Sequence, residues 1–363
     1  MSQAPLPPEF APVTAPVWSD PQREADFSAW FAHQAPIHGL QLPTVRSASV
    51  DASFRRYFRV DTATGSGIIM DAPPDKEDCR PFAKVAQLMQ SAHLLAPQVL
   101  AWDEARGFML LTDLGTKTMM EVINRNDPQA NQGLYLKAVD ALIAWQLAST
   151  PEVLPPYDDA LLRRELALFP DWYLDQHRGV TLEGADRRIL DDAFNLIVER
   201  NLAWPRVYVH RDFMPRNLMI PGDSHETRLG VLDFQDAVYG PITYDIASLM
   251  RDAFLSWDED FCLDITIRYW DKARKAGLPV GDDFGEFYRG VEWMGLQRHL
   301  KVAGIFARLT LRDGKPQYLA DTPRFIHYIR ATCERYRELK PLLRLIERIE
   351  GIEVPSGYSF GKI

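Results

Sequence analysis

The sequence lacks the features that mark membrane and secreted proteins. No apolar run approaches the ~18 residues of a membrane-spanning helix. The N-terminus, MSQAPLPPEF, has neither the basic block nor the apolar block of a secretory signal. The three cysteines, Cys79, Cys262 and Cys333, are far apart and show no C-x-x-C spacing. This pattern fits reduced thiols better than a disulfide framework, so we expect a cytoplasmic protein that has no membrane partner.

Several sequence motifs and any excess of basic charge are also missing. The net charge of −9 argues against a protein that binds nucleic acid or other polyanions over a broad surface. A G-x-x-x-x-G-K-[ST] motif is absent, which argues against a P-loop enzyme. The eight histidines show no H-E-x-x-H spacing, which argues against a zinc enzyme.

The 363 residues are enough for two domains of roughly 100–200 residues each. Six prolines within residues 1–21 predict an extended, flexible arm. Residues 22–113 are expected to form a β-rich, nucleotide-binding lobe, in which the pattern is mainly strand-like from Ser53 to Leu114. Residues 114–363 are expected to form a catalytic and substrate-binding lobe that is mainly helical apart from a small β insert. We therefore expect an α+β fold with a small β-rich lobe, joined at Thr112–Gly115 to a larger helical lobe.

Individual elements follow from hydrophobic periodicity and from capping residues. Ser19 or Asp20 is expected to cap a short helix with Pro21 in its first turn and Phe27, Trp30 and Phe31 on one face. In the first lobe we expect strands at 54–60, in GIIMDA and in GFMLLTDLG up to Gly115, with a helix at 80–93. In the second lobe we expect helices at 134–149, 160–176, 186–202 and from 244 to about 350, and short strands in RVYVH, NLMI and LGVLD.

The most informative segment reads HRDFMPRN and is followed, after a turn, by LGVLDFQD. Asp212 precedes Asn217 by five residues, and Asp233 ends the apolar run Leu229–Leu232. This order suits metal-assisted phosphoryl transfer from ATP: Asp212 accepts the proton of the acceptor hydroxyl, and Asn217 and Asp233 hold Mg²⁺. A lone aspartate in a turn is usually a turn former, but the combined pattern favours a catalytic site.

Neighbouring residues are more ambiguous. Arg216 adjoins Asn217 and either contacts a phosphate or substrate group or forms a surface ion pair. His210 and Arg211 are expected to support the loop rather than to take part in the chemistry. For Asp236 a substrate contact, a supporting carboxylate and a solvated side chain all remain open.

The segments HRDFMPRNLMI, GVLDFQDAVYGPITYDIASLMRD and QRHLKVAGIFARL resemble the aminoglycoside phosphotransferase/choline kinase family. Within that family the sequence is most similar to the anomeric sugar kinases that act on N-acetylmuramate and N-acetylglucosamine in cell-wall recycling. The resemblance runs from about Phe27 to Arg324. It implies a protein-kinase-like bilobal fold, ATP with Mg²⁺, and phosphorylation of the C1 hydroxyl of an amino sugar. It also implies that Asp245, in TYDIASL, braces the catalytic loop; without the family, Asp245 could simply favour the dipole of its helix.

The first lobe departs from the protein-kinase pattern. The segment SASVDASFRRYFRV lacks the G-x-G-x-x-G glycines, and Met70 stands where a phosphate-binding lysine is expected. The cationic candidates for nucleotide binding are Arg55, Arg56 and Arg59, with Lys84 as a further cation on the next helix. Thr112, Asp113 and Leu114, where the lobes join, are further candidate nucleotide contacts.

Arg298 and Lys301 are three residues apart on one predicted helix, so their side chains are neighbours on the same face of that helix. They either bind an anionic substrate group, such as the lactyl carboxylate of N-acetylmuramate, or belong to a solvated helix face.

Two alternatives to the amino-sugar kinase remain. A phosphotransferase of the same fold could act on an aminoglycoside, a choline-like alcohol or, with least support, a protein hydroxyl. A non-catalytic nucleotide-binding module would explain Met70, although it would not require the three polar residues of the motif. The sequence does not indicate the oligomeric state.

Overall fold

The computed structural model describes residues 16–50, 54–222 and 225–352. Contacts within the chain divide it into two units. The first comprises Met1–Glu121 and Asn217–Asp236, and the second comprises Val122–Arg216 and Ala237–Ile363. Most of the predicted arm and residues 51–53 lie outside the described residues, and Pro21 already belongs to a helix.

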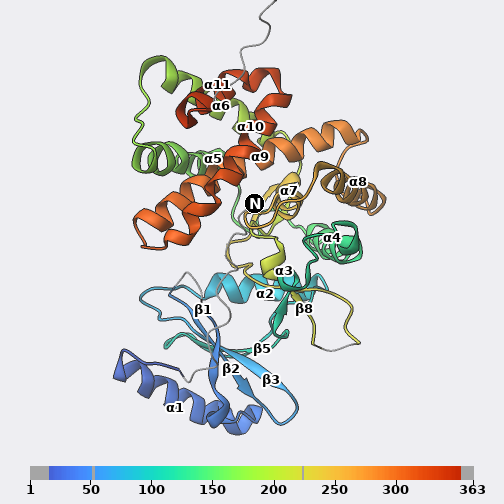
Figure 1. The fold of residues 1–363 in the computed structure, drawn as a ribbon. Coiled ribbons are helices and arrows are strands. Elements are labelled where there is room, and N and C mark those ends of the chain that lie inside the picture. Colours follow the sequence, from blue (N-terminus) through green and yellow to red (C-terminus); the bar gives the residue numbers. More distant parts are fainter. Residues whose placement is uncertain (1–15, 51–53, 223–224, 353–363) are drawn as a thin grey trace, which may run out of the picture. The chain divides into compact units, whose positions relative to one another are not determined.

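The first unit is built on a five-stranded antiparallel sheet with the strand order β1-β2-β3-β5-β4 (Figure 1). Its strands are β1 (Arg46–Val50), β2 (Arg56–Asp61), β3 (Ser66–Asp71), β4 (Val99–Asp103) and β5 (Phe108–Thr112), and its helices are α1 (Pro21–His38), α2 (Arg80–Ser91) and the 3₁₀ turn Leu42–Thr44. The predicted strand at 54–60 begins two residues later than expected, and Phe54 is exposed. The strand expected to reach Gly115 ends at Thr112.

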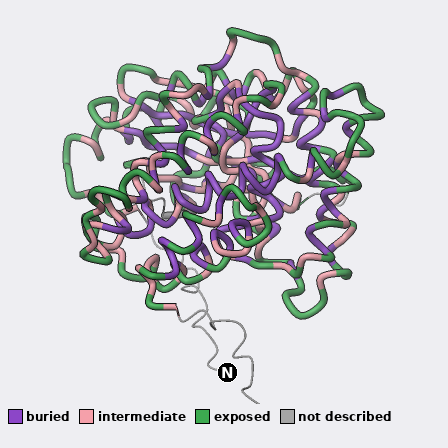
Figure 2. Tube along the Cα trace, turned by 90° about the horizontal axis from the view of Figure 1, so that it is seen from above, coloured by how far each residue is buried: buried purple, intermediate pink, exposed green. Residues whose placement is uncertain are grey.

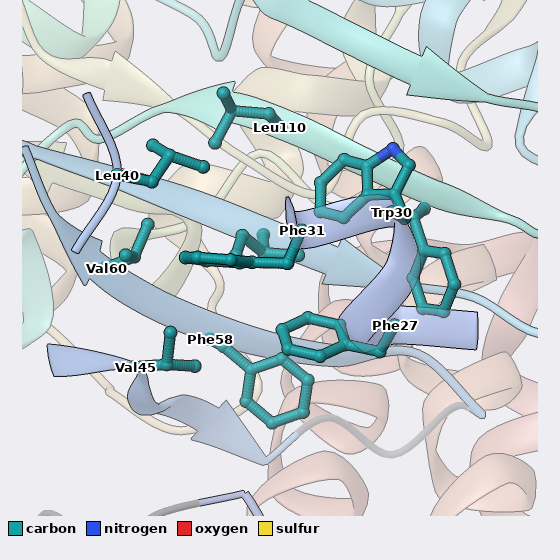
Figure 3. Close-up of a cluster of buried hydrophobic side chains, with 10 residues drawn as sticks. Phe27, Trp30, Phe31, Leu40, Val45, Phe58, Val60 and Leu110 are labelled. Atoms are coloured by element: carbon teal, nitrogen blue, oxygen red, sulfur yellow. The ribbon is translucent and has the colours of Figure 1, made fainter. Parts of the chain in front are cut away.

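Helix α1 is longer than the predicted short helix, but its start and its buried face are as expected. Asp20 caps it by accepting a hydrogen bond from the Gln22 backbone N–H, at 2.9 Å. Its aromatic residues pack on the sheet in one apolar cluster, together with Phe58 and Val60 of β2 (Figure 3). The members of this cluster are Phe27, Trp30, Phe31, Leu40, Val45, Phe58, Val60, Ile69, Phe108 and Leu110.

Residues 217–236 join the first unit because they pair with its strands. Strands β6 (Lys117–Thr118), β8 (Leu218–Ile220) and β9 (Gly230–Val231) form a small antiparallel sheet. Leu95 also bridges to Gly230, and Phe234 packs on Phe82 of α2 with ring centroids 4.9 Å apart. These contacts explain why the observed division differs from the predicted boundary after residue 113.

The second unit is mainly helical. Its main elements are α4 (Gln132–Leu147), α5 (Asp159–Leu166), a π-helix (Phe169–His177), α6 (Gly184–Leu202), α7 (Thr243–Met250), α8 (Glu259–Lys275), α9 (Phe284–Leu311), α10 (Thr322–Arg335) and α11 (Lys340–Glu350), with strands β7 (Arg206–Val209) and β10 (Val238–Pro241). The short helix α3 (Met119–Val122) spans the division between the units. Short 3₁₀ turns lie at Gln129–Asn131, Pro215–Asn217, Pro316–Asp321 and Arg337–Leu339.

Helix α9 is the central helix of the second unit and is buried along most of its length (Figure 1). It packs closely against the π-helix, where Gly304 meets the backbone of Leu168: a Cβ at this position would lie 2.2 Å from the Leu168 carbonyl oxygen. The single helix predicted for residues 160–176 is in fact α5 followed by the π-helix. Buried positions lie in the interior of the chain trace and exposed positions follow its outer turns (Figure 2).

Among the described residues, the structure contains no helix that is both long and apolar enough to cross a membrane.

Candidate active site

In the second unit, strand β7 delivers the HRDFMPR loop from the interior. Val207, Tyr208 and Val209 are buried, and β7 pairs antiparallel with β10. The loop then begins with His210, which is fully buried and whose backbone N–H donates to Asp245 Oδ2, at 2.7 Å. The position of the loop is thus fixed by a buried strand before its first catalytic candidate is reached.

Arg211 holds an unusual backbone conformation. Its φ of +76° lies in the left-handed region, which is costly for a residue that is not glycine. Two backbone contacts stabilise it: its N–H donates to Asp245 Oδ1 at 3.0 Å, and its carbonyl accepts from Arg298 Nη1 at 2.6 Å. Asp245 therefore accepts from two consecutive loop amides, so the implied bracing role is borne out.

Asp245 lies in the first turn of α7 and is fully buried. Burial raises the pKa of its carboxyl group to about 7, although the two backbone N–H groups and the Arg298 guanidinium oppose the shift. A favourable interaction with the helix dipole does not by itself explain Asp245, because its carboxylate accepts hydrogen bonds from the backbone of the loop.

Asp212 follows Arg211 directly and is half-buried. Its backbone N–H donates to His210 Nδ1 at 3.2 Å, and the His210 ring lies edge-on to the Phe213 ring, with centroids 5.6 Å apart. Phe213 and Pro215 are buried, and Met214 between them is half-buried. Asp212 is thus a carboxylate on a tightly held turn, as a proton acceptor in phosphoryl transfer must be.

Arg298 and Lys301 lie behind this loop, inside the second unit. Their exposed fractions are 5% and 8%, so the alternative of a solvated helix face is wrong. Lys301 Nζ donates to Glu165 Oε1 at 2.9 Å, and the Arg298 guanidinium lies 4.7 Å from the centre of the Tyr244 ring. Their contacts are with the loop and its neighbours, and a direct contact with substrate stays a prediction.

In the first unit, Asn217 and Asp233 lie together at one end of the β8–β9 hairpin. Asn217 Nδ2 donates to Asp233 Oδ2 at 3.2 Å, and the Leu232 backbone N–H donates to the Asn217 carbonyl at 2.9 Å. The predicted strand Leu229–Leu232 is shorter than expected, and Asp233 sits on a turn with φ +63°. The turn leaves the carboxylate exposed, while Phe234 beside it is buried.

These two side chains suit a magnesium ion. Mg²⁺ takes oxygen ligands and is commonly held by one or two protein side chains, with phosphate oxygens and water completing its shell. Asp233 offers a carboxylate, and Asn217 offers its amide oxygen because its Nδ2 already donates to Asp233. Across the described residues no group of three or more His, Cys, Asp or Glu side chains is placed to hold a metal ion.

Arg216 and Asp236 are both exposed. The Arg216 guanidinium lies 4.2 Å from the centre of the Phe254 ring, an arrangement that holds the cation in place while leaving it accessible. It also helps to lower the pKa of the buried Asp252, which burial raises to about 6 overall. This contact with the Phe254 ring differs from the surface ion pair that was the alternative for Arg216.

The three arginines predicted to bind nucleotide, Arg55, Arg56 and Arg59, all have acidic neighbours. Arg56 and Arg23 share the buried carboxylate of Asp71, and Arg59 donates to Asp113 through Nε at 2.6 Å and Nη2 at 3.0 Å. Arg55 lies 3.8 Å from Glu77. A phosphate contact by any of the three stays a prediction.

The segment Thr112–Gly115 is closely packed within the first unit. Arg59 Nη2 donates to the Gly115 carbonyl at 2.7 Å, and Ser66 Oγ donates to Asp113 Oδ2 at 2.6 Å. Gly115 has φ +110° and lies close to the backbone of Ile220, so a side chain would not fit. Thr112, Asp113 and Leu114 are half-buried, and their predicted contact with a nucleotide is not tested by these contacts.

Met70 is fully buried in the sheet. Its neutral side chain does not supply the positive charge of the lysine that is expected at this position.

Sequence reasoning missed Glu165, whose carboxylate contacts both Arg211 and Lys301. Nothing in LLRREL distinguishes this residue from an ordinary solvated helix glutamate. Its partners lie 46 and 136 residues further along the chain.

Comparisons with known proteins agree with this geometry. An N-acetylmuramate/N-acetylglucosamine kinase of Pseudomonas aeruginosa is 51% identical over 82% of this chain and 86% of the relative. An enzyme of the same name from Neisseria meningitidis is 46% identical over 93% of this chain and 100% of the relative. A solved structure of a choline/ethanolamine kinase family protein from Mesorhizobium loti superposes with a TM-score of 0.59 at 16% identity, covering 90% of this chain and 99% of that chain.

The fold is therefore the predicted α+β, protein-kinase-like fold, with an antiparallel sheet in the first unit and a mainly helical second unit. Residues 44–282 match the phosphotransferase enzyme family, and this chain belongs to that family. It is an enzyme that transfers phosphoryl groups, and the resemblance stated from the motifs is confirmed.

Proposed function

We propose that this protein is an ATP-dependent kinase that phosphorylates the C1 hydroxyl of N-acetylmuramate and N-acetylglucosamine during peptidoglycan recycling. The observation that carries the proposal is the loop at His210–Arg216, in which a half-buried carboxylate is held by buried anchors in the second unit. Two relatives named as N-acetylmuramate/N-acetylglucosamine kinases match the chain over more than four-fifths of its length, which supports the choice of acceptor.

In the proposed reaction the C1 oxygen attacks the γ-phosphorus and the bond between that phosphorus and the ADP oxygen breaks. Asp212 receives the hydroxyl proton. Asn217 and Asp233 would hold Mg²⁺, which supplies charge neutralisation for the phosphates when it is bound. Most of the rate enhancement then comes from positioning and electrostatics rather than from covalent chemistry.

The remaining candidates take supporting roles in this proposal. Arg216 is accessible and held by the Phe254 ring, so it contacts the transferred phosphate or the lactyl carboxylate of N-acetylmuramate. Asp236 is an exposed hydrogen-bond acceptor for sugar hydroxyls. Thr112, Asp113 and Leu114 contact the nucleotide, and one of Arg55, Arg56 and Arg59 contacts its phosphates. Use of ATP fits the predicted cytoplasmic location.

An acceptor panel with labelled ATP and Mg²⁺ tests the proposal. We expect turnover with N-acetylmuramate and N-acetylglucosamine, and little or none with kanamycin or choline. Faster transfer to kanamycin or choline would show that the protein is a kinase whose acceptor is not an amino sugar. Calorimetry that detects no binding of Mg·ATP at millimolar nucleotide would favour the non-catalytic alternative, which Met70 motivates.

A further inference from the structure

Glu165 of α5 is a buried carboxylate with three hydrogen-bond donors from three other parts of the second unit. Its exposed fraction is 4%. Oε1 accepts from Arg211 Nη2 at 2.5 Å and from Lys301 Nζ at 2.9 Å, and Oε2 accepts from the Tyr157 hydroxyl. Burying an ion costs several kcal/mol unless it is paired and hydrogen-bonded, and these donors satisfy both conditions.

The charge state of Glu165 follows from these contacts. Burial alone would raise its pKa, but Lys301, Arg211 and the Tyr157 hydroxyl lower it to about 2. Burial lowers the pKa of Lys301, while Glu165, Tyr244 and Asp212 raise it, with a net upward shift. Both groups are therefore charged at neutral pH.

Arg211 links Glu165 to the proposed base. Its side chain is held by Glu165, its N–H by Asp245 and its carbonyl by Arg298, so a residue in a costly backbone conformation is fixed from three directions. Asp212 is the next residue. The dihedral angles of Arg211 therefore set the direction in which the Asp212 side chain leaves the backbone.

Three cations and three carboxyl groups lie close together in this cluster. Arg211, Arg298 and Lys301 are the cations, and Glu165, Asp245 and Asp212 are the carboxyl groups near them. Removing Glu165 would leave the buried Lys301 and the half-buried Arg211 without the anion that they share. Both the loop conformation and the local folding stability depend on this carboxylate.

We propose that Glu165 is a positioning residue for Asp212, which it holds in place through the Arg211 side chain, and that Lys301 balances the charge of Glu165. The catalytic consequence rests on the proposed function; the effect on the loop does not. Because Glu165 acts on the base and not on a ligand, its loss lowers kcat and leaves the KM for either substrate nearly unchanged.

The test compares Glu165→Gln with the double variant Glu165→Gln/Lys301→Met. The single variant leaves both cations without their shared anion and is expected to lose stability as well as activity. The double variant removes one charge of each sign, so its melting temperature should recover at least part of that loss. The kcat of the double variant should nevertheless stay about 10- to 100-fold below that of the wild type, because Arg211 still lacks its carboxylate.

Glu347→Gln is the matched control. Glu347 is a buried glutamate, 6% exposed, which accepts from Arg330 Nη2 at 2.7 Å and has no part in the loop. Its substitution should lower the melting temperature while kcat stays within about twofold of the wild-type value. A parallel loss of kcat in this control would mean that destabilisation alone explains the effect, and the proposal would be overturned.

Hydrogen exchange of the peptide covering residues 207–217 gives a readout that needs no substrate. We expect faster exchange in both Glu165 variants and wild-type exchange in Glu347→Gln. Wild-type exchange in the double variant, or a wild-type kcat, would overturn the positioning role. If the wild-type protein transferred no phosphate to amino sugars, the proposed function would fail, while the exchange result would still decide the role of Glu165.

Discussion

In the second unit the charged groups around Asp212 are buried, whereas in the first unit the carboxylate of Asp233 is exposed on a turn. The loop that carries Asp212 is held by Asp245, Arg298 and the Glu165–Arg211 pair, which come from three helices and the loop itself. Asn217 and Asp233 lie at the end of one hairpin and are hydrogen-bonded to each other, and Gln235 Nε2 also donates to Asp233 Oδ1 at 2.9 Å.

The difference follows from what each group must do. A proton acceptor works only if its carboxylate is already aimed at the hydroxyl, so rigid and buried support is useful. A metal ligand must exchange with water and accommodate phosphate oxygens, so an exposed position is useful. On the proposed function, the second unit would supply a rigidly held base and the first unit would supply accessible metal ligands.

The largest effect is expected from Asp212→Asn. The amide keeps the size of the side chain but accepts a proton poorly, so kcat should fall by about 10²- to 10⁴-fold. Calorimetry should show Mg·ATP binding close to the wild-type value. Turnover within a few-fold of wild type would remove Asp212 from the role of base.

The next largest effect is expected from Asp233→Asn, which removes the charged metal ligand on the exposed turn. Activation by Mg²⁺ should require a concentration at least about tenfold higher, because one hard anionic ligand is lost. Titration of activity with Mg²⁺ at saturating ATP measures the shift. An unchanged Mg²⁺ dependence would mean that the exposed turn does not hold the metal.

Close packing of the second unit predicts a stability effect at Gly304. In Gly304→Ala the new methyl group would overlap the backbone of Leu168, so we expect a loss of about 1–3 kcal/mol or more in the free energy of unfolding. Gly133→Ala is the control, because nothing lies within 4 Å of its Cβ position. Urea unfolding of both variants should show a loss for Gly304→Ala alone. Equal stabilities would contradict the tight packing of α9 on the π-helix.

The smallest effect concerns pH. The pKa of Glu165 is about 2 in the folded protein, below its ordinary value of 4.5, so its ionisation stabilises the fold above pH 4.5 and this contribution is lost as pH falls toward 2. The difference in unfolding free energy between wild type and Glu165→Gln should therefore shrink over that range. A difference that stays constant between those pH values would show that Glu165 is not held as an ion.

Much of this description was accessible from the sequence, because some signals are local. The cap at Asp20 and the spacing of Phe27, Trp30 and Phe31 define α1, and the polar spacing from Asp212 to Asn217 defines the loop. Strand β1 was missed because Arg46–Val50 contains a single β-branched residue, Val50, and its alternation otherwise rests on small serine and alanine side chains. The spacing of Arg298 and Lys301 shows that they share a helix face, but not that Glu165, 136 residues before Lys301, lies opposite. Such long-range pairing depends on tertiary packing, which periodicity does not encode.

The proposed function requires transfer to the anomeric oxygen of the sugar, and the structure of the product tests this requirement most directly. Phosphorus and proton NMR of the product from Mg·ATP and N-acetylmuramate should show a phosphorus coupled to the anomeric proton, with no reducing end remaining. A phosphorus coupled to protons elsewhere on the ring, together with an intact reducing end, would contradict the account.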